Sequence, residues 1–201
     1  MLTMNILRVA VLFVILISRS VMCQSTYVFQ NWNPNVGLDA PVFDADGNRL
    51  FGSNYVAMLY GGPTADFLVP AVSPVYEAVP PMPFTFGLGG AGYFRLMGVE
   101  YGYVQIPIGP CGGLEWLQVR AWDLRVAPTY EQAVSLGMGG YGASSLFQLQ
   151  GGAPCAVNGD IPRYLVGLQS FSLQPVPEPG TVLLLLLGVP LLCLARRRRR
   201  C

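Results

Sequence analysis

The chain lacks histidine altogether: none of its 201 residues is His. Histidine is the commonest general base and the commonest metal-ligating side chain in proteins. Its absence excludes Ser-His-Asp and Cys-His catalytic arrangements. Chemistry based on carboxylates alone stays open, but no motif in the sequence points to it. We therefore predict that the protein is not an enzyme and has no catalytic residues, no cofactor and no metal site.

Charged residues are also scarce, at 11% of the sequence, and none of them is lysine. Seven of the twelve basic residues lie in the two ends of the chain. The body between residues 24 and 177 keeps five arginines against ten acidic residues, so its net charge is −5. A mildly acidic body of this kind argues against nucleic acid as a partner.

The N-terminus carries a short apolar run after a basic residue. Arg8 precedes residues 9–17, all of them apolar, and this run is shorter than the roughly 20 apolar residues that a transmembrane helix needs. Its length and charge order predict a cleavable signal peptide over residues 1–23. An alternative is a lipoprotein with Cys23 acylated, although the three residues before it fit a lipobox poorly.

The C-terminus holds three features in order. The triplet Pro177, Glu178 and Pro179 precedes an apolar segment, residues 181–195, and five consecutive arginines follow. The prolines lack backbone donors and favour an extended chain, which would present Glu178 to a protease. Arginines after an apolar helix keep that end in the cytoplasm. The residues that would set this topology are Arg196, Arg197, Arg198, Arg199 and Arg200.

This order resembles the PEP-CTERM sorting domain of bacteria that have an outer membrane and make exopolysaccharide. In that family an exosortase, a membrane enzyme, reads the tail and processes the protein near the triplet. The resemblance implies that residues 176–201 are a sorting signal with a transmembrane helix, and that Pro177, Glu178 and Pro179 are the recognition residues. It also implies two partners, an exosortase-type enzyme and the inner membrane. An ordinary tail anchor behind a proline-rich stalk is the simpler alternative.

Only two of the five cysteines, Cys111 and Cys155, lie in the body. In an exported domain such a pair is expected to form a disulfide. Two free or buried thiols are the alternative.

Residues 24–175 are predicted to form one mainly β domain. The 154 residues from 24 to 177 are enough for one domain with a hydrophobic core. Glycine and proline, which number 24 and 17 in the whole chain, separate short runs rich in aromatic and β-branched residues. This pattern predicts an antiparallel β-sandwich that resembles a jelly roll. Residues 50–60, apolar on both parities, predict a central strand. One short helix is expected after Thr129, with Gln132 completing a capping box and Gly137 ending it.

The run 114–123 alternates cleanly and offers a candidate binding face. Its odd positions 117, 119 and 121 are apolar and predict the core side. The other side carries indoles beside polar groups, which suits stacking on sugar rings and hydrogen bonding to sugar hydroxyls. The predicted sugar-binding residues are Trp116, Gln118, Arg120 and Trp122. The alternative is that this face packs under the helix or a loop, with Arg120 paired to Glu115 or Asp123.

The run from Asp44 to Asn48 resembles the start of a calcium loop, because alternate carboxylates suit a hard cation. Asp46 and Gly47 between apolar runs are also a strong hairpin signal, and a turn is the favoured interpretation.

These observations together predict a non-enzymatic, exported protein of the cell surface or biofilm matrix. It would be held in the inner membrane by its C-terminal helix and reach the surface or extracellular matrix after processing. A carbohydrate-binding or adhesive module for exopolysaccharide is the alternative function.

Overall fold

The computed structural model describes residues 24–75, 77–85, 89–98, 102–153 and 160–175. The predicted signal peptide, the sorting triplet, the apolar segment, the arginine run and Cys155 all lie outside the described residues. The part of the chain that the structure describes holds no helix long and apolar enough to cross a membrane.

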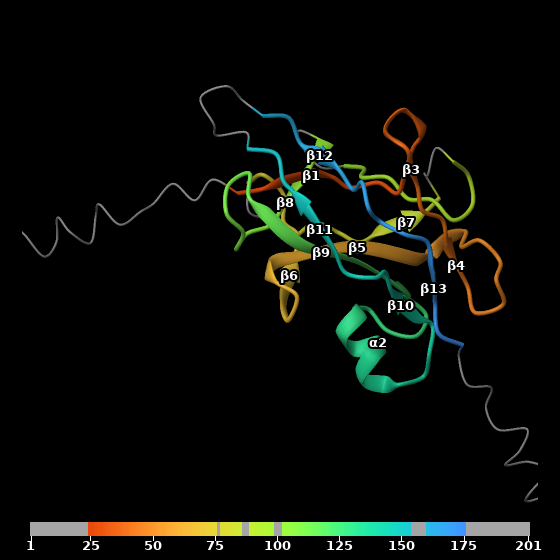
Figure 1. Cartoon of the computed structure of the whole chain (residues 1–201). Coiled ribbons are helices and arrows are strands. Elements are labelled where there is room, and N and C mark those ends of the chain that lie inside the picture. Colours follow the sequence, from red (N-terminus) through yellow and green to blue (C-terminus); the bar gives the residue numbers. More distant parts are fainter. Residues whose placement is uncertain (1–23, 76, 86–88, 99–101, 154–159, 176–201) are drawn as a thin grey trace, which may run out of the picture.

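The centre of the molecule is a six-stranded antiparallel sheet (Figure 1). Its two long strands, β5 (Gly52–Thr64) and β9 (Leu114–Asp123), pair with each other. On the far side of β9 lie β10 (Tyr141–Ala143) and β11 (Phe147–Gln150). On the far side of β5 lie β6 (Phe67–Pro70) and β7 (Met82–Phe84). The central place predicted for residues 50–60 is therefore confirmed.

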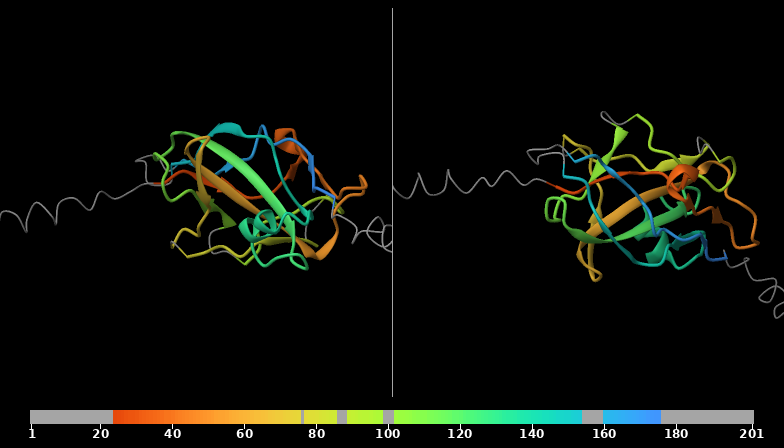
Figure 2. Two further views of the ribbon diagram at one scale, coloured as in Figure 1. Left: turned by 90° about the horizontal axis from the view of Figure 1, so that it is seen from below. Right: turned by 45° about the horizontal axis from the view of Figure 1, so that its top comes forward.

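Short strands form a second layer over one face of this sheet (Figures 1 and 2). One group contains β1 (Thr26–Val28), β8 (Val104–Gln105) and β12 (Arg163–Tyr164). Two further pairs are β4 (Val42–Phe43) with β13 (Phe171–Ser172), and β2 (Trp32–Asn33) with β3 (Leu38–Asp39). A 3₁₀ turn, η1 (Pro34–Val36), connects β2 to β3.

Two of these pairings, β1 with β12 and β4 with β13, are parallel. The pairings of the central sheet are antiparallel as predicted, whereas these two pairs depart from the predicted antiparallel β-sandwich. The paired strands lie more than 100 residues apart in the sequence, so no local turn pattern reveals their direction. Arg95 forms only an isolated bridge, with Gln30. The jelly-roll resemblance stays a prediction.

The hydrophobic core fills the space between the two layers. The inner face of the central sheet contributes Leu59, Leu117 and Val119, each at most 1% exposed. The second layer contributes aromatic rings, among them Phe29 and Phe94, whose centroids lie 4.6 Å apart. Burial of this apolar surface is the main force that holds the layers together.

Helix α2 (Tyr130–Leu136) covers part of the opposite, outer face of the central sheet (Figure 2, left). Its ends follow the predicted signals: the Thr129 hydroxyl accepts a hydrogen bond from Gln132 N at 3.3 Å, and Gly137 adopts a left-handed φ of 62°. Ala133 is its only fully buried residue. The helix therefore lies against β9 and β10 with one narrow side.

Candidate binding site

The outer face of β9 is where the sequence predicts a binding surface, and the alternation is confirmed. Leu117, Val119 and Ala121 are fully buried on the inner face. Trp116, Gln118 and Arg120, at the even positions of the run, lie on the outer face and are half-buried.

Trp122, the fourth predicted member, does not offer an exposed indole. It is 1% exposed and packs with Val56 and Ala133 beneath α2. Its ring meets Tyr130 edge to face, with centroids 6.2 Å apart. The structure therefore removes Trp122 from the predicted sugar-stacking surface, because the helix occupies the space that a sugar would need.

Arg120 is held at the centre of the outer face by aromatic rings. Its guanidinium lies 4.0 Å from the centroid of the Tyr60 ring and 5.1 Å from that of Tyr130, within the range of cation–π attraction. Its Nε donates to Gln118 Oε1 at 2.9 Å. Its Nη1 lies 3.4 Å from Glu131 Oε1, so the ionic partner is neither Glu115 nor Asp123, the two that the sequence suggested.

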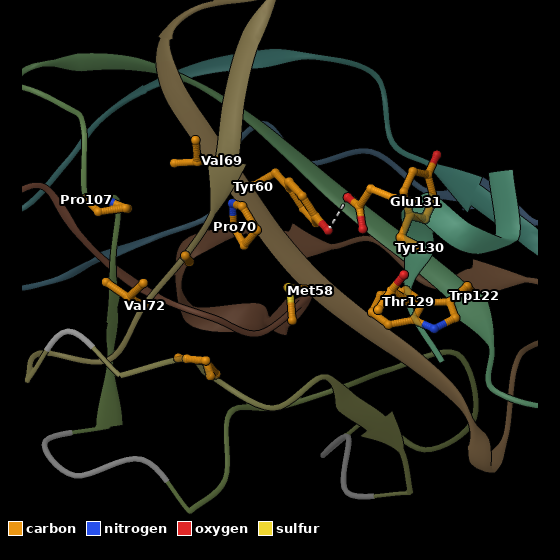
Figure 3. Close-up of a pocket in the computed structure, with 13 residues that line it drawn as sticks. Met58, Tyr60, Val69, Pro70, Val72, Pro107, Trp122, Thr129, Tyr130 and Glu131 are labelled. Atoms are coloured by element: carbon orange, nitrogen blue, oxygen red, sulfur yellow. Dashed lines mark hydrogen bonds between the residues drawn. The ribbon is translucent and has the colours of Figure 1, made fainter. Parts of the chain in front are cut away.

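Tyr60 links this arginine to the helix. Its hydroxyl donates to Glu131 Oε1 at 2.7 Å (Figure 3). Burial, followed by this hydrogen bond to a carboxylate, raises the pKa of the Tyr60 phenol above its usual value. Tyr60 therefore remains a neutral donor at physiological pH.

Two hollows flank the ridge that Tyr130 and Glu131 form. The apolar hollow, about 470 Å³, lies between the outer face, α2 and the loop of residues 69–79 (Figure 3). Met58, Tyr60, Trp122 and Val72 contribute to its walls, and Glu131 is the only carboxylate among the described residues that line it. The polar hollow, about 380 Å³, is lined by Gln118, Arg120, Val134 and Ala143 as well as by the ridge. The lining of the first hollow suits an apolar ligand, and the lining of the second suits a ligand with hydroxyl groups.

Glu115, at the start of β9, is a buried carboxyl that the sequence reasoning missed as a site. It is fully buried; Tyr27 OH donates to its Oε2 at 2.9 Å, while Oε1 has no hydrogen-bond partner among the described residues. Burial raises the pKa of Glu115 to about 7, and the hydrogen bond from Tyr27 limits the rise. The sequence could have predicted this burial, because position 115 has the same parity as Leu117 and Val119 and therefore lies on the core side of the strand.

A side chain at Gly109 would overlap Glu115 Oε1. The backbone therefore closes over this carboxyl, and no substrate can reach it without movement of the 109–113 turn.

Cys111 is disulfide-bonded in the structure. The pairing with Cys155 stays a prediction, because Cys155 lies outside the described residues.

The Asp44–Asn48 run forms a hairpin turn. Asp44 Oδ1 accepts hydrogen bonds from Asp46 N at 2.9 Å and from Asn48 N at 2.8 Å. Gly47 has a φ of 84°, a conformation that glycine adopts at little cost. Within the described residues no group of three His, Cys, Asp or Glu side chains could hold a metal ion, and the turn interpretation is confirmed.

Comparison with known proteins identifies the C-terminal tail. Residues 175–200 match the family model of the PEP-CTERM protein-sorting motif. The predicted recognition residues, Pro177 to Pro179, and the arginine run fall within this match. No curated protein and no solved structure matches the chain. The class of protein is therefore defined by its tail: it carries an exosortase-type sorting signal behind a β-rich body.

The motif indicates an exported protein that associates with the membrane through its tail and is processed by an exosortase. The topology expected from the arginines, with the extreme C-terminus in the cytoplasm, stays a prediction.

Proposed function

We propose that the protein is a non-enzymatic component of the cell surface or biofilm matrix, and that its β-rich body is the part delivered there. The supporting observation is the position of the sorting motif. It begins at residue 175, shortly after β13 (Phe171–Ser172), the last strand in the part of the chain that the structure describes. This position supports a body that ends where the sorting motif begins.

The chemistry of the body supports a role without catalysis. The sequence has no histidine, and the carboxyl with the most perturbed surroundings, Glu115, is fully buried. The outer face instead offers aromatic rings, an amide and a guanidinium, which are groups that bind and orient ligands.

The decisive experiment on sorting changes one residue of the triplet in the native host. Glu178→Ala should leave export intact and leave the tail uncut in the inner membrane, because the recognition carboxylate is gone. Intact mass and membrane fractionation distinguish the processed from the unprocessed protein. Replacement of Arg196 to Arg200 by neutral residues should instead weaken retention in the inner membrane.

Glu77→Ala is the matched control, because Glu77 is an exposed carboxylate of the body outside the sorting motif. It should be processed like the wild type. If Glu178→Ala and the wild type have equal masses that retain the arginines, in one membrane fraction, the tail is only an anchor and the proposal fails.

A carbohydrate-binding or adhesive module for exopolysaccharide is the second candidate. It is favoured by the half-buried Trp116, Gln118 and Arg120 on the outer face, of which Gln118 and Arg120 line the polar hollow. A glycan array on the purified body tests it. Trp116→Ala should abolish any binding that uses this face, whereas Phe51→Ala, which removes a 66% exposed ring elsewhere, should not.

A further inference from the structure

A third hollow, of about 320 Å³, lies in the second layer, away from the outer face. We name it the Trp32 hollow. Its lining combines two aromatic rings with amide groups and one guanidinium: Trp32, Tyr164, Gln30, Asn33, Asn35 and Arg95, together with Pro34. None of the described residues that line it carries a carboxylate. None of these residues belongs to the predicted sugar-binding face.

The fold builds this hollow from segments distant in the sequence. A backbone bridge places Gln30 opposite Arg95, and the parallel pairing of β1 with β12 places Tyr164 beside Val28. Trp32 is fixed in the β2–β3 hairpin opposite Asp39, and its ring lies 6.4 Å from that of Tyr93. The ring platform is therefore set by backbone pairings rather than by a free loop.

Some polar atoms of the side-chain amides around the ring platform already form hydrogen bonds within the protein, and others do not. Asn33 Oδ1 accepts from Asn35 N at 3.1 Å, which leaves the Asn33 amide donors unused. Gln30 Nε2 donates to Trp32 O at 3.1 Å and holds the Gln30 side chain in place. Planar amides that are oriented in this way can bond to the hydroxyl groups of a sugar.

Arg95 differs from the other arginines of the body. Arg120, Arg125 and Arg163 each pair with a carboxylate, and Arg49 stacks on Tyr93 at 5.3 Å. Arg95 has no ionic or aromatic partner among the described residues, and its side chain is exposed at the rim of the hollow. In a body of net charge −5 it is a local cation with an unused, fork-shaped donor.

We propose that the Trp32 hollow binds a carboxylate-bearing saccharide unit. The Arg95 guanidinium would take the sugar carboxylate, the Trp32 ring would stack on the apolar face of the sugar ring, and the amides would bond to its hydroxyls. This inference rests on the carbohydrate-binding function proposed above and assigns it to a different surface. The volume, at the small end of the roughly 300–1,000 Å³ typical of ligand sites, suits one or two sugar units.

Three probes separate charge from shape: an oligogalacturonate, the same oligomer with its carboxylates methyl-esterified, and dextran sulfate. Isothermal titration with the purified, oxidised body should detect the oligogalacturonate. The methyl ester should bind at least about tenfold more weakly, because hydrogen bonds to a charged group are worth more than those to a neutral one. Dextran sulfate should not compete, since it carries charge without the carboxylate geometry.

Variants locate the site. Arg95→Gln and Trp32→Ala should each weaken oligogalacturonate binding about tenfold or more. Arg163→Gln is the matched control, because Arg163 precedes Tyr164 in the same strand but pairs with Asp160 and does not line the hollow. It should bind like the wild type. Unchanged melting temperatures would show that each variant is folded.

The outcomes distinguish binding at the Trp32 hollow from carbohydrate binding on the outer face. Loss of binding with Trp116→Ala but not with Arg95→Gln would overturn it and keep carbohydrate binding on the outer face. Equal losses with Arg95→Gln and Arg163→Gln, or competition by dextran sulfate, would reduce the effect to general charge attraction and also overturn it. Absence of binding to any probe would overturn the assignment to a carboxylate-bearing sugar, while neutral sugars on the array would still test the broader function.

Discussion

Two tyrosine–carboxylate pairs lie on opposite faces of the central sheet, and their surroundings differ. On the inner face, Tyr27 donates to Glu115 at 2.9 Å, and both residues are fully buried. On the outer face, Tyr60 donates to Glu131 at 2.7 Å, where the Glu131 side chain is 59% exposed and Arg120 lies 3.4 Å away. The same hydrogen bond therefore occurs once in a closed site without a cation and once in an open site with one.

This difference shows which face can change its partners. A buried carboxyl without a counter-ion is costly to ionise, so the inner pair makes the free energy of unfolding depend on pH. The outer pair keeps water and a guanidinium as alternatives, so a ligand can displace its contacts at little cost. The inner pair is closed to solvent, and on the outer face the Glu131 carboxylate is exposed.

The largest expected effect concerns Glu115 and pH. Because the pKa of Glu115 is raised from 4.5 to about 7, the folded state binds this proton more tightly than the unfolded state. The stability that it contributes is full below pH 4.5 and is lost as pH rises through 7, up to about 3 kcal/mol. Glu115→Gln should remove this slope, and urea unfolding at pH 5 and pH 8.5 measures it.

Glu131→Gln is the control on the outer face, and it should keep the slope of the wild type. If Glu115→Gln unfolds with the same pH dependence as the wild type, the buried carboxyl is not the group that titrates, and the contrast between the two faces is lost.

A smaller difference is expected between the two tyrosines. Tyr27→Phe leaves Glu115 without its hydroxyl donor in a closed site, and should cost about 1–3 kcal/mol at pH 8, where the carboxyl is ionised. Tyr60→Phe removes the same hydroxyl beside an exposed carboxylate that water can reach, and should cost less than about 1 kcal/mol. Equal losses in the unfolding free energy would contradict the comparison.

Features that depend on neighbouring residues could be predicted from the sequence. The alternation of β9, the caps of α2 at Thr129 and Gly137 and the turn at Gly47 follow from local periodicity and backbone preferences. The central place of β5 followed from its apolar residues of both parities.

Features that depend on distant pairings could not be predicted. Parallel pairs such as β1 with β12 leave no turn signal. The burial of Trp122 depends on where α2 packs, and the sequence of this short helix does not determine its position. The Trp32 hollow combines residues near positions 30, 95 and 164, and no spacing in the sequence links them.

The smallest effect is expected at Arg120. Arg120→Met keeps much of the stem's packing but removes the charge over Tyr60 and the contact with Glu131. Because the side chain is 21% exposed, the loss should be about 1 kcal/mol or less. Arg120→Lys should restore only part of it, since an ammonium lacks the planar face that stacks on the ring and the Nε that donates to Gln118. A partly exposed ion pair is also screened by salt, so the difference between wild type and Arg120→Met in urea unfolding should shrink in 1 M NaCl. A difference that stays constant with salt would mean that Arg120 stabilises the fold through packing alone. The outer pair would then resemble the inner pair in having no ionic contribution from a cation, which would contradict the comparison.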